Sequence, residues 1–533
     1  MPLTKLFSAA VVGVDAYKVE IETNVSMFGD PQIVTVGLPD AAVRESQHRV
    51  WTALANSGYH SQVGRITVNL APADVRKEGP SFDLPIAVGI ILSADNARSG
   101  KKVAEASLLP MAAGTPPTQS LDLTRTAIIG ELSLGGEVRK VKGILPIALS
   151  LRDAGVRSFI VPAENADEAA LAEGLDVYGV ENLREAVQLV TGATTGTPRR
   201  IDLASLYALS PRSDADFAEV KGQEIAKRAI EVAVAGGHNI LMVGPPGAGK
   251  SMLARRIRSI LPPLTLAEAL EVSKIHSVAG TLTAGHPLVF ERPYRSPHHT
   301  VSDAGLLGGG THPAPGEVSL AHHGVLFLDE LPEFDRSALE TLRQPLEDGH
   351  VTISRAAGTC VFPSRFMLVA AMNPCPCGYY GDSRKGCGCT QHQMLKYRSK
   401  ISGPLLDRID LHITVSASEI TDLQTAPRGT GSAEMRENVR IAREAQTRRF
   451  ANTPRLRVNA QMERRDLEKW CQLDDESLDL LRNAMVRMHL SHRAHDRILK
   501  VARTIADIDG MENIISEHIA EAIQYRTMDR NAN

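Results

Sequence analysis

The chain is sparing with cysteine and with aromatic residues, and it has no long apolar run. Its 533 residues include six cysteines and two tryptophans, and aromatic residues make up 4% of the composition. Clustered cysteines in a cytosolic protein more often bind metal or stay reduced than form structural disulfides. No segment approaches the roughly eighteen uninterrupted apolar residues of a transmembrane helix. The first residues carry one lysine and a short apolar stretch that ends at Asp15, too weak for a secretory signal, so we expect a cytoplasmic protein.

A strong excess of charge is also missing, because the formal net charge is -3. This excludes a surface coated with basic groups, but it leaves open a basic face or pore that binds DNA. Hydrophobic residues at 43% and charged residues at 23% are typical of folded globular proteins. At about 100 to 200 residues per domain, the chain has room for about three domains.

Three segments differ in their patterning. Residues 1–190 alternate short strand-like and helical stretches, which is typical of a mixed α/β domain. Residues 191–215 include TGATTGTPRR and are predicted to form a linker. Residues 216–426 carry the motifs described next, and residues 427–533 show the periodicity of amphipathic helices. The sequence therefore predicts an α/β protein with a helical C-terminal domain.

The segment NILMVGPPGAGKSMLARRI combines an apolar strand, a glycine-rich turn and the start of a helix. It matches the Walker A pattern in the strand-to-helix setting that gives the pattern its meaning. Backbone N–H groups of such a turn converge on phosphate oxygens, and the helix N-terminus adds positive potential. Lys250 is expected to reach the β and γ phosphates of ATP, and Ser251 to ligate Mg²⁺. The predicted nucleotide-binding residues are Gly244, Pro245, Pro246, Gly247, Ala248, Gly249, Lys250 and Ser251.

Two further apolar strands end in polar residues that suit ATP hydrolysis. GVLFLDELPEF has the Walker B form, in which Asp329 holds Mg²⁺ and Glu330 polarises the attacking water. FMLVAAMN ends in Asn373, whose amide suits a sensor that orients the same water. An asparagine at a strand end is otherwise a turn or cap residue. The order of the three motifs favours the sensor.

Arginines follow in positions that suit a ring ATPase. Arg408 in GPLLDRIDLH lies before another apolar strand, where an arginine finger enters the site of a neighbouring subunit. The alternative is a surface salt bridge with Asp407 or Asp410. SHRAHDRILKVARTIADI offers a second sensor, for which Arg493 is preferred over Arg497 and Arg503 because it starts the helix.

Four of the six cysteines gather directly behind Asn373, in NPCPCGYYGDSRKGCGC. Their thiolates can form a tetrahedral Zn²⁺ site, although common structural sites use a CxxC spacing rather than CxC. A reduced loop or a redox pair is the alternative, and His392 can replace one cysteine. Cys360 and Cys471 are expected to pack as small apolar residues. The predicted zinc ligands are Cys375, Cys377, Cys387 and Cys389.

With RPYRSPHHTVSDAGLLGGGTHPAPGEVSLAHHGVLFLDELPEF, NPCPCGYYGD and GPLLDRIDLH in view, the chain resembles the ComM/YifB family of magnesium-chelatase-like AAA+ ATPases over its whole length. The resemblance implies a Lon-protease-like N-terminal domain, an AAA+ core with an insert in its second helix, and a helical lid. It further implies a homohexamer that drives DNA branch migration or unwinding in recombination and natural transformation. The insert would span residues 276–317, and GHVTISRAAGTCVFPSR would form a hairpin facing DNA. Arg355, near its turn at Ala356 to Gly358, is the predicted phosphate contact, and His298 and His299 are insert residues without an assigned role.

The resemblance to Lon places Ser81, in LAPADVRKEGPSFDLPIAVGI, at the position of the catalytic serine. A serine protease of this kind also needs a lysine to activate the hydroxyl. Leu145 and Ile147 stand where Lon has its lysines, and Lys140 and Lys142 are out of register. We therefore expect a scaffold or DNA-positioning domain. Two other functions stay open: a magnesium-chelatase-type remodelling subunit, which needs an integrin-like partner chain, and an ATP-dependent protease, which needs the missing dyad.

Overall fold

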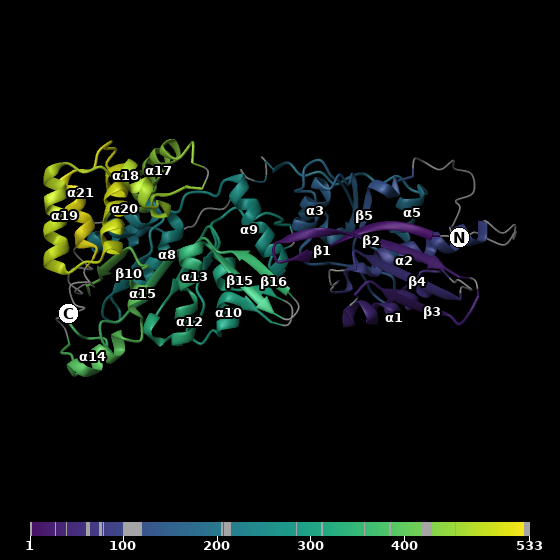
Figure 1. Ribbon diagram of the computed structural model, residues 1–533, viewed down its shortest axis with the longest axis horizontal. Helices are drawn as coiled ribbons and strands as arrows, with labels where there is room; N and C mark the ends of the chain where they lie inside the picture. Colours follow the sequence, from purple (N-terminus) through teal and green to yellow (C-terminus); the bar gives the residue numbers. More distant parts are fainter. Residues whose placement is uncertain are drawn as a thin grey trace.

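The computed structural model is elongated, with a seven-stranded sheet at one end, a five-stranded sheet in the middle and a group of helices at the other end (Figure 1). No helix in the part of the chain that is described combines the length and hydrophobicity that crossing a membrane requires. The structure describes residues 3–26, 28–38, 40–59, 64–73, 77, 79–99, 120–203, 206, 215–283, 285–310, 313–355, 358–382, 385–416, 429–453 and 455–526, apart from the side chains at positions 41, 42, 44, 98, 99, 355 and 358.

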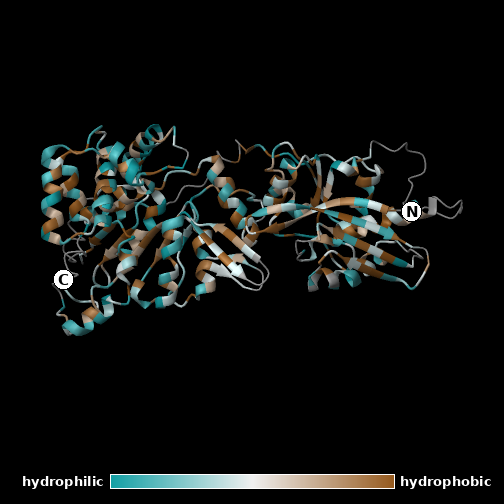
Figure 2. Ribbon diagram, in the orientation of Figure 1, coloured by the Kyte–Doolittle hydropathy of each residue, from teal (hydrophilic) through white to brown (hydrophobic). Residues whose placement is uncertain are grey.

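The N-terminal sheet is mixed and has the strand order β3-β4-β2-β1-β5-β8-β9. Its second strand alternates between buried and partly exposed residues over much of its length, so one side of it faces the core. Figure 2 shows this alternation of hydrophobic and hydrophilic residues along the strands. The strands are β1 (Leu3–Val12), β2 (Asp15–Val25), β3 (Gln32–Val36), β4 (Arg65–Ala71), β5 (Thr126–Ile128), β8 (Ser158–Pro162) and β9 (Asp176–Val180).

Two groups of helices cover this sheet, one through each of two hydrophobic clusters. The first cluster joins the sheet to α1 (Ala41–Asn56), α2 (Asp83–Ser99) and α5 (Leu183–Thr191). The second joins it to α3 (Ile144–Asp153) and α4 (Ala166–Ala169). These strands and the helices that cover them form a mixed α/β arrangement.

The middle sheet is parallel, with the strand order β11-β14-β17-β10-β18. Almost every residue of its four longer strands is buried, because helices cover both faces, which is why these strands are continuous apolar runs in the sequence. The strands are β10 (Ile240–Val243), β11 (Tyr294–Arg295), β14 (Val325–Leu328), β17 (Met367–Met372) and β18 (Leu411–Thr414).

Helices from three parts of the chain cover the parallel sheet. One face packs with α7 (Glu224–Gly236), α8 (Lys250–Arg256) and the C-terminal helices. The other face packs with helices that include α10 (Asp303–Leu307), α12 (Arg336–Thr341), α13 (Arg343–Asp348) and α15 (Gly403–Leu406). The C-terminal helices are α17 (Ser432–Arg449), α18 (Arg464–Trp470), α19 (Asp475–Met488), α20 (His492–Ile508) and α21 (Ser516–Gln524).

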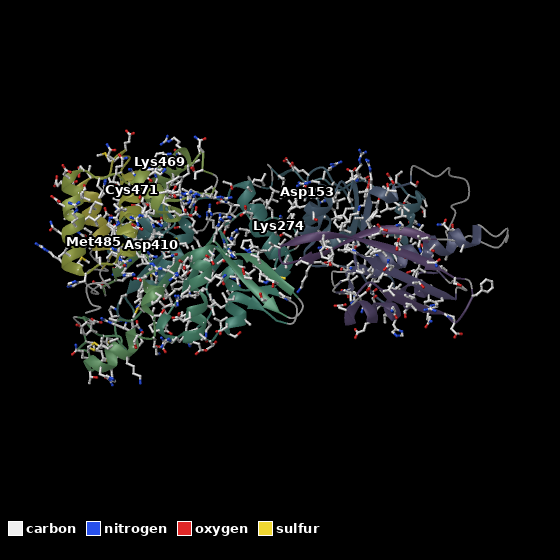
Figure 3. All side chains as sticks on the ribbon, in the orientation of Figure 1. Asp153, Lys274, Asp410, Lys469, Cys471 and Met485 are labelled. Atoms are coloured by element: carbon white, nitrogen blue, oxygen red, sulfur yellow. The ribbon has the colours of Figure 1, made fainter. Side chains whose placement is uncertain are left out.

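The N-terminal unit joins the middle unit through α9 (Leu266–Ala279), which packs on α3. Ser277 of α9 donates a hydrogen bond to the carboxylate of Glu168, and the Gly143 N–H donates to the Ser277 carbonyl at 3.0 Å. Burial raises the pKa of Glu168, while hydrogen bonds from Ser277, the Leu145 backbone and Asn165 oppose the rise. The two units therefore share a hydrophobic core and a buried polar network at this junction, which Lys274 marks in Figure 3.

Two hairpins lie beside each other near the same junction. A short hairpin of β12 (Gly308–Gly309) and β13 (Ala314–Pro315) separates α10 from α11 (Glu317–Leu320). The predicted insert is therefore shorter than residues 276–317, because α9 is continuous to Ala279 and β11 belongs to the sheet. The second hairpin, β15 (His350–Arg355) with β16 (Gly358–Pro363), confirms the two predicted strands.

Candidate nucleotide-binding site

The glycine-rich turn leaves β10 at the carboxyl edge of the parallel sheet and leads into α8. Gly247 and Gly249 have φ values of 77° and 89°, which side chains with a Cβ rarely adopt. Gly244 lies so close to the neighbouring strand end that a Cβ there would meet the Val415 carbonyl oxygen at 2.2 Å. Glycine is therefore required at these positions for the turn that the sequence predicts.

Lys250 lies at the centre of the constellation. Its ammonium donates to the carbonyls of Gly244 at 2.6 Å and Pro245 at 3.0 Å, and to Oδ1 of Asn373 at 3.2 Å. Burial lowers the pKa of Lys250, and the negative charges of Asp329 and Glu330 oppose this. The structure thus brings the predicted sensor Asn373 into direct contact with the Walker A lysine.

The two predicted magnesium ligands also meet. Ser251 Oγ lies 2.5 Å from Asp329 Oδ2, at the end of β14. Hydroxyl and carboxylate oxygens are ligands that Mg²⁺ prefers, so this pair fits the ion in its residue chemistry. Glu330 follows with a φ of 52°, and its side chain is 55% exposed.

His299 faces Glu330, a contact that the sequence analysis missed. Its Nδ1 lies 3.8 Å from Glu330 Oε2. The contact depends on the pairing of β11 with β14, which brings residues 31 positions apart to one edge of the sheet. No spacing rule in the sequence signals it, because β11 is only two residues long.

The four clustered cysteines lie next to this site. Sγ of Cys375 is 3.4 Å from that of Cys377 and 3.6 Å from that of Cys387, and all four Sγ atoms lie within 4.8 Å of one another. Tetrahedral zinc with Zn–S near 2.3 Å requires S–S separations of about 3.8 Å, so the cluster can hold a metal ion. The pKa of Cys377 is lowered to about 6, first by a hydrogen bond from the backbone of Tyr379, which favours the thiolate.

The cysteine loop also touches the glycine-rich turn. A Cβ at Gly378, where φ is 87°, would meet the ring of Pro246 at 2.8 Å. His392 lies exposed on α14 (Gln391–Arg398) and is not a member of the cluster. Cys471 is buried in the core beneath the C-terminal helices, as predicted, and Cys360 lies partly buried on β16 of the second hairpin.

Arg408 lies at the opposite, amino edge of the sheet, three residues before β18. Its guanidinium pairs with Glu347 and donates to the Pro404 carbonyl at 2.8 Å. The pKa of Glu347 is lowered, first by the hydrogen bond from Arg408 and then by nearby charges that include Arg493. The structure therefore groups the predicted finger and the predicted second sensor around one carboxylate, away from Lys250. The alternative considered for Arg408, a salt bridge with Asp407 or Asp410, is not what forms; its partner is Glu347.

The other two arginines considered for the second sensor have different surroundings. Arg503 is buried, donates to Asp507 at 3.1 Å and donates to the Met511 carbonyl at 2.6 Å, so it serves the C-terminal core. Arg497 lies 3.6 Å from Asp410. The side chain of Arg355 and part of its predicted turn fall outside the described residues.

Glu271, His322 and His323 form a second group with metal-binding residue types. His322 Nδ1 accepts the Arg365 N–H at 3.0 Å, so the proton of the neutral ring is on Nε2, which donates to Glu271. Burial lowers the pKa of His322 to about 4, which keeps the ring neutral. A metal ligand needs its lone pair on the nitrogen facing the ion, so we interpret the group as a hydrogen-bonded cluster.

Ser81 lies in a single turn (Pro80–Phe82) directly before α2. Lys140 donates to the Leu282 carbonyl at 3.3 Å, and the side chain of Lys142 lies against Gly280, so both lysines face the middle unit. Leu145 and Ile147 are buried in the sheet-facing cluster. None of these contacts assembles a serine–lysine dyad.

Replacing Arg49 with methionine is expected to destabilise the N-terminal unit by about 3–5 kcal/mol at pH 8, because it strands the buried carboxylate of Asp83. Arg49 Nε lies 2.9 Å from Asp83, whose side chain is fully buried. Burial raises the pKa of Asp83 from 3.8 to about 6, and Arg49 limits the rise. The folded state thus holds a proton that the unfolded state releases, so stability falls as the pH rises through this window.

The loss should therefore be smaller at pH 5, where Asp83 is protonated and needs no counter-charge. Urea denaturation at the two pH values measures it, with Trp51 of α1 as the fluorescence probe in a Trp470→Phe background. Arg139→Met, which removes an exposed arginine 3.9 Å from Glu131, is the control. Equal losses at pH 5 and pH 8 would show that Asp83 is not the group responsible.

A P-loop on a parallel sheet of this order, with lysine, serine, aspartate and asparagine gathered at its carboxyl edge, defines a nucleotide-binding protein of the AAA+ class. Matches to protein-family models agree with this class. The model described as "Magnesium chelatase, subunit ChlI" matches residues 216–423, "Subunit ChlI of Mg-chelatase" matches residues 21–165, and "Magnesium chelatase, subunit ChlI C-terminal" matches residues 429–526.

Comparison with relatives identifies the family within this class. Competence protein ComM of Haemophilus influenzae is 41% identical over 533 residues, covering 99% of this chain and 98% of that protein. YifB of Salmonella typhimurium is 40% identical over 532 residues, with 99% and 98% covered. A magnesium-chelatase 67 kDa subunit of Chlorobaculum parvum is 29% identical over 162 residues, covering 30% of this chain and 23% of that subunit. The chain belongs to the ComM/YifB family of magnesium-chelatase-like AAA+ proteins.

Proposed function

We propose that the protein is a magnesium-dependent ATPase that assembles into a homohexameric ring and moves branched or single-stranded DNA, promoting branch migration in recombination and natural transformation. The observation that carries the proposal is the carboxyl-edge constellation of Lys250, Ser251, Asp329 and Asn373, in a chain that matches a competence protein almost from end to end.

The constellation supports ATP hydrolysis because each expected role has a residue in place. Backbone groups of the glycine-rich turn and Lys250 would hold the phosphates, and Ser251 and Asp329 would hold Mg²⁺, which neutralises charge on the phosphates. Glu330 would accept a proton from the attacking water, and Asn373 would orient that water. General-base catalysis of this kind contributes about 10² to 10⁴ in rate.

The placement of the arginines supports assembly into a ring. Ile240 of β10 pairs with Leu411 of β18, so Arg408 precedes the strands whose far ends carry the glycine-rich turn. Four strand residues span roughly 13 Å, too far for Arg408 to reach the phosphates held by its own subunit. An arginine on this edge would serve a nucleotide that a neighbouring copy presents, and heterologous contacts of that kind build rings.

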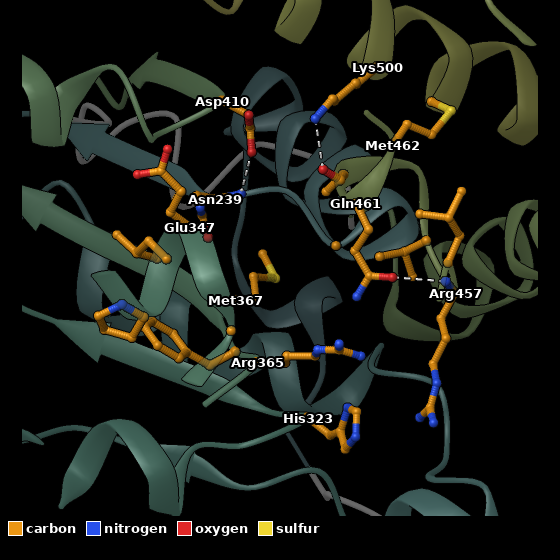
Figure 4. Close-up of a pocket in the computed structure, with 18 of the residues that line it drawn as sticks. Asn239, His323, Glu347, Arg365, Met367, Asp410, Arg457, Gln461, Met462 and Lys500 are labelled. Carbon is orange, nitrogen blue, oxygen red and sulfur yellow. Dashed lines mark hydrogen bonds between the residues drawn. The ribbon is translucent and has the colours of Figure 1, made fainter. Parts of the chain in front are cut away.

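A cavity of about 510 Å³ at the amino edge supports this assignment. Glu347 and Asp410 lie at one end of it and Arg457 and His323 at the other (Figure 4). Arg408, Arg443 and Arg497 are among the residues that line it. Guanidinium groups in a concave site favour phosphate, which suits a surface that receives a neighbour's nucleotide.

DNA contact is assigned to the two hairpins. They share one hydrophobic cluster, through Leu306 next to β12 and Ile353 on β15, so they are positioned as a unit. Arg355 remains the predicted phosphate contact of the second hairpin. A few such contacts in each subunit, repeated around a ring, make binding strongly dependent on salt.

We further assign zinc to the four-cysteine cluster. The clustered thiols suit a closed structural site, in which the metal supplies cross-linking energy rather than chemistry. The loop they close contacts Pro246 and begins two residues after Asn373, so its order supports the nucleotide site. Metal bound there would therefore help to position Asn373.

The test is strand displacement on a forked or three-stranded DNA substrate, together with ATPase rates at low salt with and without DNA. Wild type is expected to hydrolyse ATP faster with DNA and to displace the strand, and Lys250→Ala to do neither. Lys385→Ala, which removes an exposed lysine stacked on Tyr379, is the control. ATP hydrolysis that no DNA structure stimulates would refute the motor and favour the magnesium-chelatase-type remodelling subunit.

A further inference from the structure

The backbone around Arg408 is held by two side chains that lie far away in the sequence. Asn239 Nδ2 donates a hydrogen bond to the Arg408 carbonyl at 2.9 Å. Arg526, a buried residue that follows α21, donates through Nη1 to the Ile409 carbonyl at 2.8 Å and to the Asp410 carbonyl at 3.4 Å. These two side chains therefore fix three consecutive carbonyls of the segment between α15 and β18.

Asn239 stands directly before β10, the strand whose other end leads into the glycine-rich turn. Its N–H donates to Asp410 Oδ2 at 3.0 Å, a bond that Figure 4 shows at one end of the cavity. Its carbonyl accepts the N–H groups of Asp410 and Leu411, both at 3.0 Å. Its Oδ1 accepts the Leu368 N–H of β17 at 2.8 Å. Asn239 thus joins β10, β17 and the segment that carries Arg408 at the amino edge of the sheet.

The bonds that Asn239 makes require an amide. One end of the side chain donates to the Arg408 carbonyl and the other accepts from the Leu368 N–H. An amide carries both a donor and an acceptor, whereas a carboxylate carries acceptors alone. A partly buried carbonyl that loses its donor costs about 1–3 kcal/mol unless the backbone moves to find another. Loss of the Asn239 donor would therefore shift the backbone that carries Arg408.

We propose that Asn239 is a positioning residue, which holds the backbone of Arg408 so that the guanidinium reaches the nucleotide of a neighbouring copy. The inference rests on the proposed ring ATPase and adds to it the residue that places the finger. A misplacement of about 1 Å can cost about 10² in rate. Since Arg526 still holds the next two carbonyls, removing the Asn239 amide is expected to lower kcat by about 10- to 10²-fold.

Two variants and a control isolate the bond to Arg408. Asn239→Ala removes both side-chain bonds, whereas Asn239→Asp keeps an acceptor for the Leu368 N–H and loses only the donor. Both should lower kcat to the same extent and change KM for ATP by less than about twofold, because a finger acts in the transition state. Asn56→Ala is the control, since it removes an exposed amide that donates to the Leu134 carbonyl at 2.8 Å in the N-terminal unit.

Mixing Asn239→Ala with Lys250→Ala subunits shows which site the asparagine serves. If Asn239 positions the finger, an intact Lys250 meets an intact finger at about one quarter of the interfaces of a randomly mixed ring, so activity rises to about a quarter of wild type. If Asn239 instead supports the glycine-rich turn of its own subunit through β10, no interface is complete. Activity then falls to about half that of Asn239→Ala alone.

Three outcomes would overturn the inference: a wild-type kcat in Asn239→Asp, a raised KM with an unchanged kcat, or a mixture less active than Asn239→Ala alone. Thermal unfolding checks the fold of each variant, and Asn239→Asp, which keeps the bond to β17, carries the test if Asn239→Ala does not fold. Failure of the proposed function looks different, because Arg408→Ala itself would then keep its kcat or fail to restore activity when mixed with Lys250→Ala.

Discussion

Replacing Arg408 with alanine is expected to lower kcat for ATP hydrolysis by about 10³ to 10⁵, the usual contribution of an arginine finger. Its guanidinium would stabilise charge on the phosphates only in the transition state, so KM for ATP should change little. The fold should survive, because the bond that is lost joins Arg408 to Glu347, whose side chain is 59% exposed. Steady-state kinetics on the assembled protein measure the effect.

A control variant distinguishes the effect of losing a specific arginine finger from the effect of losing positive charge in general. Arg343 contributes to the same positive field around Glu347, but it lies 3.0 Å from Glu340 and is 42% exposed. Arg343→Ala should therefore reduce kcat by no more than about fivefold. A reduction as large as that of Arg408→Ala would mean that charge at this edge matters without a specific finger.

Mixing two inactive variants tests whether Arg408 acts between subunits. Lys250→Ala keeps Arg408 but has lost its own phosphate ligand, and Arg408→Ala has the reverse defect. In a randomly mixed ring about one quarter of the interfaces join an intact Lys250 to an intact Arg408, so activity should return to a comparable fraction of wild type. A mixture as inactive as its components would contradict action in trans.

The parts of the candidate site that could be predicted are those attached to strand ends. The apolar runs before Gly244, Asp329 and Asn373 predict buried parallel strands. Parallel strands bring their carboxyl ends to one edge of the sheet. The contacts of Lys250 with Asn373 and of Ser251 with Asp329 follow from that geometry. The N-terminal α/β unit and the C-terminal helices were likewise visible as changes in hydrophobic periodicity.

The parts that could not be predicted depend on long-range pairing. β11 is too short for its sequence to identify it as a strand, so nothing placed His299 beside Glu330. The pair of Arg408 with Glu347 also escaped, because closer acids at positions 407 and 410 were the natural partners in sequence. Asp410 instead accepts the Asn239 N–H at 3.0 Å, between the sheet and the C-terminal helices (Figure 3). The local sequence does not show which acidic residue the fold will bury and which it will leave to pair with Arg408.

Replacing Cys375 with serine is expected to abolish stoichiometric zinc binding and to lower kcat by about 10², because a small displacement of a catalytic group is enough for such a loss. Cys375 is the buried member of the cluster and lies two residues after Asn373. Loss of the closed loop would release the packing of Gly378 on Pro246 and the contact of Asn373 with Lys250. Metal analysis of the purified chain and ATPase kinetics measure the two effects.

Two control variants test whether losing the metal causes the reduction in kcat. His392→Ala should retain zinc and full activity, because the four thiols already suffice as ligands, and Cys471→Ala removes a buried thiol that has no part in the cluster. Both should therefore keep the metal that Cys375→Ser loses. If the wild-type protein contains no zinc, the assignment of zinc to the cluster is wrong. If the Cys375→Ser variant lacks zinc but has the wild-type kcat, the cluster does bind zinc, but the metal does not support Asn373. The second result would also break the link between the cysteine loop and the nucleotide site, since the contact with Pro246 would then be dispensable for hydrolysis.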